Sequence, residues 1–490
     1  MRWLGFLLRA ASVFLLSAQL CTAFWFRQKF GKVEIDQILF HLQPASHTIL
    51  YSDQLTVWSG IKNCILGPIL YTTILMTLFS RARGKCRRVG DAFLALPVQA
   101  VAQLGAAAIT ISMTLTFPAS AVAGEDWIAT LYREPANLGI PRHKKNLILI
   151  YGESLEFSYG ASPFEGDLLG PLDHGLLARA KSFPHFRQMA GTGWTIAGMI
   201  ASQCGIPLKP LGIFGQNRFG QNASQFLPNA LCLGDILKRS GYRNVFLGGA
   251  STQFAGKGLF LQTHGYEEVL GREEWLSEDS QFALNEWGLN DDDLFAESLK
   301  KLAELSRSND PFNLTILTIG MHPPDGILAP SCPRDFGDLR DSVECTAHLI
   351  DDFIESAYAK GYLAEADVVV LGDHLSQRNS QHERLEAIPE RSVFNKFLTS
   401  SDLPVNRDEI DHFDVAPTIL SALGYALPGG QFGLGCSALG TVSCTSLVFD
   451  PLADAKLDRS SPFYNALWLP IKAGQASGPT ALSAHPSGQK

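Results

Sequence analysis

The chain has 490 residues, of which 46% are apolar and 18% are charged. This composition excludes an intrinsically disordered chain, which has few apolar residues. The formal net charge is −8, from 40 Lys and Arg against 48 Asp and Glu, and it argues against a nucleic-acid-binding protein, whose surface would be basic. No heptad pattern, Gly-x-y repeat or fixed period of roughly 20–50 residues runs through the chain, so coiled-coil, collagen and solenoid folds are excluded.

The charges divide the chain into two parts. The first 124 residues contain 11 basic and four acidic side chains, so the remainder carries a formal net charge of −15. Apolar runs in the first part predict about three transmembrane helices, approximately at residues 3–26, 58–80 and 92–120. A bilayer core requires about 20 mostly apolar residues per helix. We therefore expect residues 1–124 to form a membrane anchor.

A basic segment sets the expected orientation of this anchor. Residues 81–88 hold five positive charges, and such segments stay in the cytoplasm. With three helices, the N-terminus is then inside and everything after about residue 124 is outside. A cleaved signal peptide is the alternative for the first run, but Phe24, Trp25 and Phe26 continue the apolar run past the expected cleavage region.

The cysteines agree with an exported domain. Cys21, Cys64 and Cys86 lie in the anchor, and six cysteines follow it. An even number in an exported domain suggests disulfide bonds. Proximity along the chain favours the pairs Cys332–Cys345 and Cys436–Cys444. The two cysteines that remain give the third expected pair, Cys204–Cys232.

Strand and helix patterns alternate from residue 145 to about 425. Such alternation predicts an α/β fold with a mostly parallel central sheet and helices on both faces. We expect a linker at 125–144, a catalytic domain at 145–450, and a C-terminal segment at 451–490 whose end is disordered. The predicted strands are 146–151, 241–248, 313–319 and 366–371, and the predicted helices are 231–240, 294–306 and 343–362.

Three of these strands end in side chains that bind metal ions or activate hydroxyl groups. Strand 146–151 is followed by Glu153, strand 313–319 by His322, and strand 366–371 by Asp373 and His374. In parallel sheets, ligands bind beyond the carboxyl ends of the strands. The pattern therefore predicts a divalent-metal site. Asp, His and Glu together suit Zn²⁺ or Mn²⁺, and they suit Mg²⁺ less well because of the imidazole.

A nucleophile near this site cannot be chosen by spacing alone. Metal coordination lowers the pKa of a hydroxyl group and can make it a nucleophile. The candidates by residue type are Ser154, Thr192, Thr195, Ser202 and Cys204.

Three segments resemble the alkaline phosphatase/sulfatase superfamily, and within it the membrane-bound phosphoglycerol transferases. They are Gly152-Glu-Ser-Leu-Glu156, Thr195-Ile-Ala-Gly-Met-Ile-Ala-Ser-Gln-Cys-Gly-Ile-Pro207 and Asp373-His374. The resemblance runs from about residue 130 to residue 447. It implies a sulfatase-like domain that follows the transmembrane helices, in a bacterial inner-membrane protein whose catalytic domain lies in the periplasm.

The resemblance also implies roles for single residues. Glu153, Asp373 and His374 match metal ligands, and Thr195 matches a nucleophilic threonine that also ligates the metal. His322 matches a histidine near the leaving group or the incoming hydroxyl. The substrate-binding residues are then His322 and Lys257, the latter lying where relatives place a basic group near the substrate phosphate.

Two departures from the superfamily narrow the activity. Sulfatases carry a Cys/Ser-x-Pro-x-Arg motif, whereas this chain has Thr195-Ile-Ala-Gly-Met, which argues against sulfate-ester hydrolysis. The segment 373–379 also lacks the Gly-Glu run that is common in phosphoethanolamine transferases.

The implied activity is transfer of phosphoglycerol from phosphatidylglycerol to osmoregulated periplasmic glucans through a phospho-threonine intermediate, with release of diacylglycerol. The alternatives are transfer of phosphoethanolamine, transfer to another cell-envelope acceptor, and a non-catalytic membrane-anchored binding protein. No nucleotide is expected as a partner, because the chain has neither a Walker A nor a Gly-x-Gly-x-x-Gly motif. His412 is expected mostly to pack below the site, and Trp194 beside Thr195 is expected to be a packing residue rather than a sugar platform.

Overall fold

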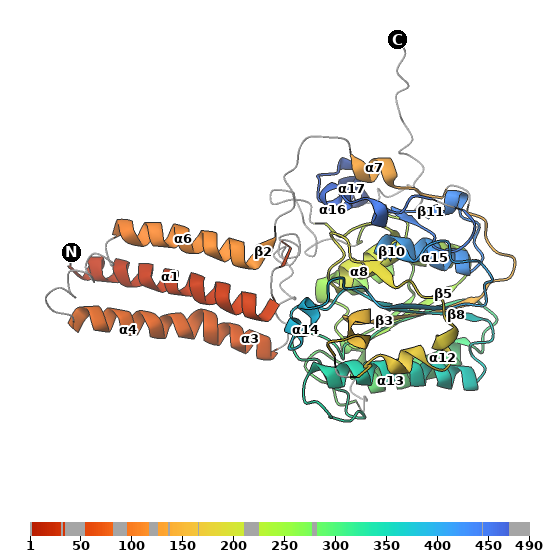
Figure 1. Ribbon diagram of the computed structural model, residues 1–490, viewed down its shortest axis with the longest axis horizontal. Coiled ribbons are helices and arrows are strands. Elements are labelled where there is room, and N and C mark those ends of the chain that lie inside the picture. The colour runs from red at the N-terminus through yellow and green to blue at the C-terminus, as the bar shows by residue number, and fades with distance from the viewer. Residues whose placement is uncertain are drawn as a thin grey trace, which may run out of the picture.

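The computed structural model describes residues 2–30, 33–34, 54–81, 96–116, 126–135, 138–164, 166–209, 225–276, 282–442 and 444–469. Figure 1 shows a helical bundle beside a larger α/β domain. The predicted ends of the third transmembrane run and the predicted disorder after residue 470 lie outside the described residues.

The bundle contains three helical segments. The first is α1 (Arg2–Phe30), and the second runs through α3 (Gln54–Ile61), the π-helical turn η1 (Lys62–Leu66) and α4 (Gly67–Arg81). The third is α6 (Leu96–Thr114). Two stretches, Leu7–Arg27 and Trp58–Phe79, are long and apolar enough to cross a membrane, and the apolar stretch of α6, Val98–Ser112, is shorter.

Polar side chains join these helices. The amide of Gln103 on α6 donates to the carbonyl and hydroxyl oxygens of Ser12 on α1, both at 3.1 Å. The indole N–H of Trp25 on α1 donates to the Ser59 hydroxyl on α3 at 2.9 Å. Hydrogen bonds of this kind hold helices together where the surroundings are apolar. A short parallel pairing of β1 (Val33–Glu34) with β2 (Leu115–Thr116) follows α1 and α6.

The α/β domain is built on a six-stranded sheet with the order β6-β5-β7-β3-β8-β9. Neighbouring strands are parallel except for β9, which pairs antiparallel with β8. The predicted α/β fold with a mostly parallel sheet is therefore confirmed. The strands are β3 (Asn146–Gly152), β5 (Arg243–Gly248), β6 (Glu268–Leu270), β7 (Phe312–Leu317), β8 (Ala366–Gly372) and β9 (Asn395–Leu398).

Helices cover both faces of this sheet (Figure 1). Residues that alternate along β3 divide between two cores: Leu147 and Leu149 pack with α8, α9 and α15, whereas Ile148 and Ile150 pack with α12 and α13. Both faces of the central strand are therefore buried, which explains its continuous apolar sequence. The helices are α8 (Thr195–Cys204), α9 (Leu233–Arg239), α10 (Lys257–Thr263), α12 (Asp291–Leu305), α13 (Leu339–Ala359) and α15 (Val415–Ala422).

Short elements complete the domain. The strands β4 (His185–Arg187) and β10 (Glu409–Asp411) pair parallel, and β11 (Gln431–Phe432) pairs antiparallel with β12 (Gly435–Cys436). The further short helices are α7 (Trp127–Leu131), α11 (Arg272–Trp275), α14 (His382–Glu386), α16 (Ala453–Leu457) and α17 (Pro462–Leu467). The three disulfide pairs expected from the sequence, Cys204–Cys232, Cys332–Cys345 and Cys436–Cys444, are all present.

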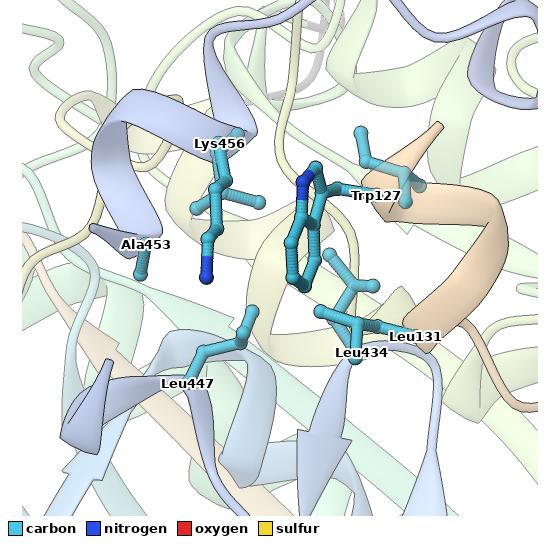
Figure 2. Close-up of a pocket in the computed structure, with 8 residues that line it drawn as sticks. Trp127, Leu131, Leu434, Leu447, Ala453 and Lys456 are labelled. Atoms are coloured by element: carbon cyan, nitrogen blue, oxygen red, sulfur yellow. The ribbon is translucent and has the colours of Figure 1, made fainter. Parts of the chain in front are cut away.

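The first and last elements of the domain pack together. Asp126, which caps α7, accepts hydrogen bonds from the Ser461 hydroxyl and the Phe463 amide at the start of α17. Figure 2 shows the small apolar pocket that remains between α7 and α16, into which Trp127 and Lys456 project. The Lys456 ammonium lies 3.9 Å from the centre of the Trp127 ring, a cation–π contact. The segment expected to be a linker, 125–144, thus contains a helix that packs on the domain.

The end of the sheet where its parallel strands terminate, here called the catalytic edge because the predicted site residues follow these strands, faces the bundle. Helix α14 comes shortly after β8, and Figure 1 shows it next to the bundle end that is formed by α3. Burial lowers the pKa of His382 on α14, and the charges of Arg378 and of Arg27 on α1 contribute to this shift. Arg27 therefore lies near α14. The carboxyl ends of the parallel strands point toward the bundle.

Candidate active site

The candidate site lies where the three central strands of the sheet end. Strands β7, β3 and β8 are neighbours, and each is followed by one part of the predicted site: His322, Glu153, and Asp373 with His374. Glu153, Asp373 and His374 are buried, and one potential ligand atom of each lies within 4.8 Å of the other two. The structure thus brings together three of the four side chains that the sequence predicted as metal ligands.

Helix α8 brings Thr195 to this cluster. The Thr195 hydroxyl donates to Glu153 Oε2 at 3.1 Å, and Thr195 is the first residue of the helix. The N-terminus of a helix carries partial positive charge, which favours an anion or an alkoxide at this position. Thr195 is therefore both next to the cluster and in a favourable field for a negatively charged oxygen.

A glycine permits this helix to lie so close to the ligands. A Cβ atom built on Gly198 would lie 1.8 Å from the carbonyl oxygen of Asp373, which is far inside van der Waals contact. Any side chain at residue 198 would push α8, and Thr195 with it, away from Asp373. Gly198 is a determinant of the site that the sequence patterns did not single out.

The spacing of the donor atoms fits a single metal ion. His374 Nε2 lies 3.4 Å from Glu153 Oε1 and 3.5 Å from Asp373 Oδ2. Donors about 2.1 Å from a tetrahedral ion lie roughly 3.4 Å apart. Asp373 Oδ2 is buried and accepts no hydrogen bond from any residue that the structure describes. The free carboxylate oxygen and the donor spacing both suit a metal bound by Glu153, Thr195, Asp373 and His374.

Neighbouring groups orient these ligands. His374 Nδ1 lies 2.8 Å from the Leu375 carbonyl oxygen, which can only accept, so Nδ1 carries a proton and Nε2 is the nitrogen that faces the cluster. Loss of the Nε2 proton would free its lone pair for a metal ion. The backbone amides of Ser154 and His374 donate to Asp373 Oδ1 at 2.8 and 2.9 Å. His412 Nε2 lies 2.9 Å from the Asp373 carbonyl oxygen, so this buried histidine can donate a hydrogen bond that holds the backbone of Asp373 in place.

The electrostatics of the cluster favour a bound cation. Burial raises the pKa of Asp373 to about 7, and the negative charge of Glu153 adds to this effect. Burial alone would raise the pKa of Glu153, but the hydrogen bond and charge of His374 lower it to about 2. Burial would lower the pKa of His374, but the charges of Asp373 and Glu153 raise it to about 9. A cation would replace the proton in compensating the two carboxylates.

The other candidate nucleophiles have different surroundings. Thr192 donates to the Met189 carbonyl, Ser202 lies within a buried hydrogen-bonded cluster, and Cys204 is in a disulfide bond. Ser154 donates to Glu153 Oε1 at 2.9 Å, but it is completely buried. Thr195 is the candidate that combines contact with Glu153 and partial exposure.

Lys257 begins helix α10 and is buried near the cluster. Burial lowers the pKa of its amine to about 8, although the charges of Glu153, Glu273 and Asp373 oppose this shift. Within the described residues, no carboxylate forms an ion pair with Lys257. The predicted contact of Lys257 with a substrate phosphate stays a prediction.

His322 follows β7 and is half-buried. Its Nδ1 atom lies 2.8 Å from the Pro323 carbonyl oxygen and must donate to it, so Nε2 is free to accept or deliver a proton. The charge of His322 also contributes to lowering the pKa of Glu153. Its ring packs on Trp287, a residue that no sequence motif had indicated.

A family model described as "Sulfatase" matches residues 145–425. The chain belongs to the sulfatase family. The region matched to the sulfatase family begins just before β3 and contains every side chain of the site described above.

Two curated relatives of this sulfatase-family chain carry the same name. Phosphoglycerol transferase I of Salmonella paratyphi B is 35% identical over 407 residues, which cover 78% of this chain and 51% of that protein. Phosphoglycerol transferase I of Escherichia coli strain SMS-3-5 is 37% identical over 339 residues, which cover 66% of this chain and 43% of that protein. The chain thus spans about half the length of the curated relatives it matches.

Solved structures resemble the same domain. A protein in the alkaline phosphatase superfamily from Vibrio parahaemolyticus is 19% identical, with a TM-score of 0.48 over 64% of this chain and 74% of that one. The lipoteichoic acid synthase LtaP from Listeria monocytogenes is 16% identical, with a TM-score of 0.48 over 66% of this chain and 80% of that one.

Proposed function

We propose that this chain is a metal-dependent phosphoglycerol transferase of the bacterial inner membrane. It takes phosphoglycerol from phosphatidylglycerol, transfers it to a periplasmic glucan and releases diacylglycerol. The observation that carries this proposal is the contact between the Thr195 hydroxyl and the buried Glu153, Asp373 and His374 cluster. The similarity to phosphoglycerol transferase I supports the choice of the transferred group.

The metal, Zn²⁺ or Mn²⁺ by the chemistry of its ligands, would lower the pKa of the Thr195 hydroxyl and withdraw charge from the phosphate. Thr195 first loses its hydroxyl proton to bulk water. In the first step, the resulting Thr195 Oγ1 alkoxide forms a bond to phosphorus while the bond from phosphorus to the diacylglycerol oxygen breaks. His322 Nε2 delivers a proton to that leaving oxygen. The product is phosphoglycerol esterified to Thr195.

The second step reverses these roles. His322 Nε2 accepts the proton of a glucan hydroxyl, whose oxygen bonds to phosphorus while the Thr195–phosphorus bond breaks. Lys257 holds a phosphate oxygen through both steps, and its buried position strengthens that interaction. No nucleotide is consumed, because the phosphodiester bond of the lipid supplies the free energy that forms the new one.

The arrangement of the bundle supports a lipid donor. The carboxyl ends of the parallel strands face the bundle (Figure 1). Thr195 contacts Glu153 at these ends, so a headgroup at the membrane surface would lie on the same side as Thr195. The soluble part carries a net charge of −15 and would be repelled by anionic lipids, so the anchor must hold it near its donor. The three disulfides agree with a domain outside the cytoplasm.

The test uses the full chain with phosphatidylglycerol labelled in its headgroup, Mn²⁺ or Zn²⁺, and a β-glucan. We expect label on the glucan and release of diacylglycerol, and we expect Thr195→Ala to reduce both by at least about a thousandfold. Ser154→Ala is the matched control, because it removes the other hydroxyl that contacts Glu153. It should retain most of the activity. Full transfer by Thr195→Ala would overturn the proposal.

The same assay separates the alternatives. Diacylglycerol release without label on the glucan would keep the chemistry and exclude the glucan as acceptor. Release from phosphatidylethanolamine, with none from phosphatidylglycerol, would identify a phosphoethanolamine transferase.

A further inference from the structure

The imidazole of His322 packs against the indole of Trp287. The two ring centroids are 4.1 Å apart, and the ring planes are inclined by 36°. Both residues are half-buried, so this contact lies at the boundary between the protein interior and the open side of the site. Phe254, which comes three residues before Lys257, meets Trp287 edge to face with a centroid distance of 6.0 Å.

Two contacts restrict the His322 ring. The hydrogen bond from Nδ1 to the Pro323 carbonyl fixes one edge of the ring, and Trp287 covers one of its faces. An imidazole ring that is held at one edge and on one face cannot rotate freely, so the direction in which its second nitrogen points is fixed. That nitrogen is Nε2, the atom that exchanges protons in the proposed function.

Consecutive residues at the start of α12 hold both partners of this contact. The Asp291 carboxylate accepts hydrogen bonds from the amides of Ile319 and Gly320, both at 2.8 Å, in the loop that leads to His322. The Asn290 side chain donates to the Ala283 carbonyl at 3.0 Å, in the loop that carries Trp287. The two loops are therefore attached to one rigid element.

The Trp287 loop has a further internal support. The side-chain oxygen of Asn285 accepts hydrogen bonds from the amides of Trp287 and Gly288 at 2.8 and 3.0 Å. The Asn285 amide donates to the Asn290 side-chain oxygen at 2.7 Å. The Leu289 amide donates to the Gly249 carbonyl at 3.1 Å, which ties the loop to the end of β5. The position of the indole is thus determined by the fold.

We propose that Trp287 is a positioning residue that holds the His322 imidazole in the orientation needed for proton transfer. The identity of the leaving and incoming oxygens rests on the proposed function, but the contact between the two rings does not. Without Trp287 the ring can rotate about its side-chain bonds, and the fraction of time that Nε2 points toward the reacting oxygen falls.

The first test compares Trp287→Leu with Trp287→Phe in the full chain. We expect Trp287→Leu to lower kcat for diacylglycerol release about tenfold or more, with the KM for phosphatidylglycerol changed less than about threefold. Trp287→Phe keeps an aromatic face and should stay within about threefold of the parent chain. The control is Tyr358→Leu, which removes an exposed aromatic ring from α13 on the other face of the sheet and should change neither constant.

A substrate that needs no proton donor distinguishes positioning from a general structural role. In the p-nitrophenyl diester of phosphoglycerol, nitrophenolate leaves without protonation. Trp287→Leu should therefore keep the rate of the nitrophenolate burst while it slows the release of diacylglycerol. In a His322→Gln background, where no imidazole remains to be oriented, Trp287→Leu should change diacylglycerol release less than about twofold.

A spectroscopic measurement tests the contact separately from the reaction. In chain labelled at histidine, the Hε1 resonance of His322, assigned by its loss in His322→Gln, should show a ring-current shift that disappears in Trp287→Leu. If the parent chain releases no diacylglycerol, the proposed donor is wrong. The parent chain and Trp287→Leu are then compared by the rate at which the phosphoglycerol–enzyme, formed from the nitrophenyl ester, breaks down. A folded Trp287→Leu that keeps its kcat, or an equal loss on both substrates, would overturn the inference.

Discussion

Lys257 shows how burial can tune a single residue for phosphate chemistry. Its pKa of about 8 lies below the ordinary value of a lysine because the amine is removed from water, which opposes the charged form. The ammonium form is thus present at neutral pH but is lost as the pH rises through 8. A substrate phosphate would meet a cation that is poorly hydrated and therefore interacts strongly.

This pKa leads to a prediction about pH. If the Lys257 ammonium holds the phosphate, kcat/KM measured at saturating metal should fall as the pH rises through 8. Lys257→Arg should move this decline to higher pH, because a guanidinium stays charged. The measurement is a pH profile of diacylglycerol release for both chains. An unchanged decline in Lys257→Arg would exclude Lys257 as its source.

At the residue scale, the sequence could predict the ligand set but not all of its surroundings. The apolar runs in the sequence show where two of the strands end, and the ligands Glu153, Asp373 and His374 follow these ends. We could therefore expect the three side chains to lie close together. The position of Trp287 could not be expected, because hydrogen bonds at the start of α12 and at the end of β5 bring its loop beside His322. No motif in the sequence encodes that attachment.

Helix α8 links the packing of the domain to its chemistry. Its N-terminus presents Thr195, its Gly198 contacts the backbone of Asp373, and its last residue, Cys204, is joined to Cys232 before α9. The helix is thus fixed at the site and at its far end. The sequence predicted the disulfide and the threonine, but the need for a glycine depends on a distance between two elements that only the structure provides.

Gly198→Ala should destabilise the domain and impair metal binding. The methyl group would overlap the Asp373 carbonyl oxygen, so α8 must move, at a cost of about 3 kcal/mol in the free energy of unfolding. Thermal unfolding and titration with Mn²⁺ or Zn²⁺ would measure both effects. Gly105→Ala in α6 is the matched control, because a Cβ there meets no atom within 4 Å. A Gly198→Ala chain as stable as this control would contradict the packing argument.

The whole molecule combines an anchor and a catalytic domain of opposite charge. The N-terminus and the ends of α4 and α6 that flank the basic segment lie at the bundle end away from the domain (Figure 1). By the positive-inside rule, we propose that this end of the bundle lies in the cytoplasm and the domain in the periplasm. The alternation of strands and helices in the sequence predicted the α/β domain. Only the structure shows that the carboxyl ends of its parallel strands face the bundle.

This orientation can be tested with a membrane-impermeant thiol reagent on intact cells. Lys360→Cys places a thiol on an exposed position at the end of α13 and should be labelled from outside. Cys86, in the basic segment, should be labelled only after the membrane is opened. Labelling of Cys86 in intact cells without labelling at position 360 would reverse the orientation.

The covalent step at Thr195 is the central claim, and it can be measured directly. The full chain is incubated with phosphatidylglycerol and metal but without a glucan acceptor, quenched in acid and digested for mass spectrometry. The account predicts that the peptide containing Thr195 gains the mass of phosphoglycerol, and that adding the glucan removes it. Phosphoglycerol on another residue, or transfer to the glucan with no modified peptide at any time, would contradict it.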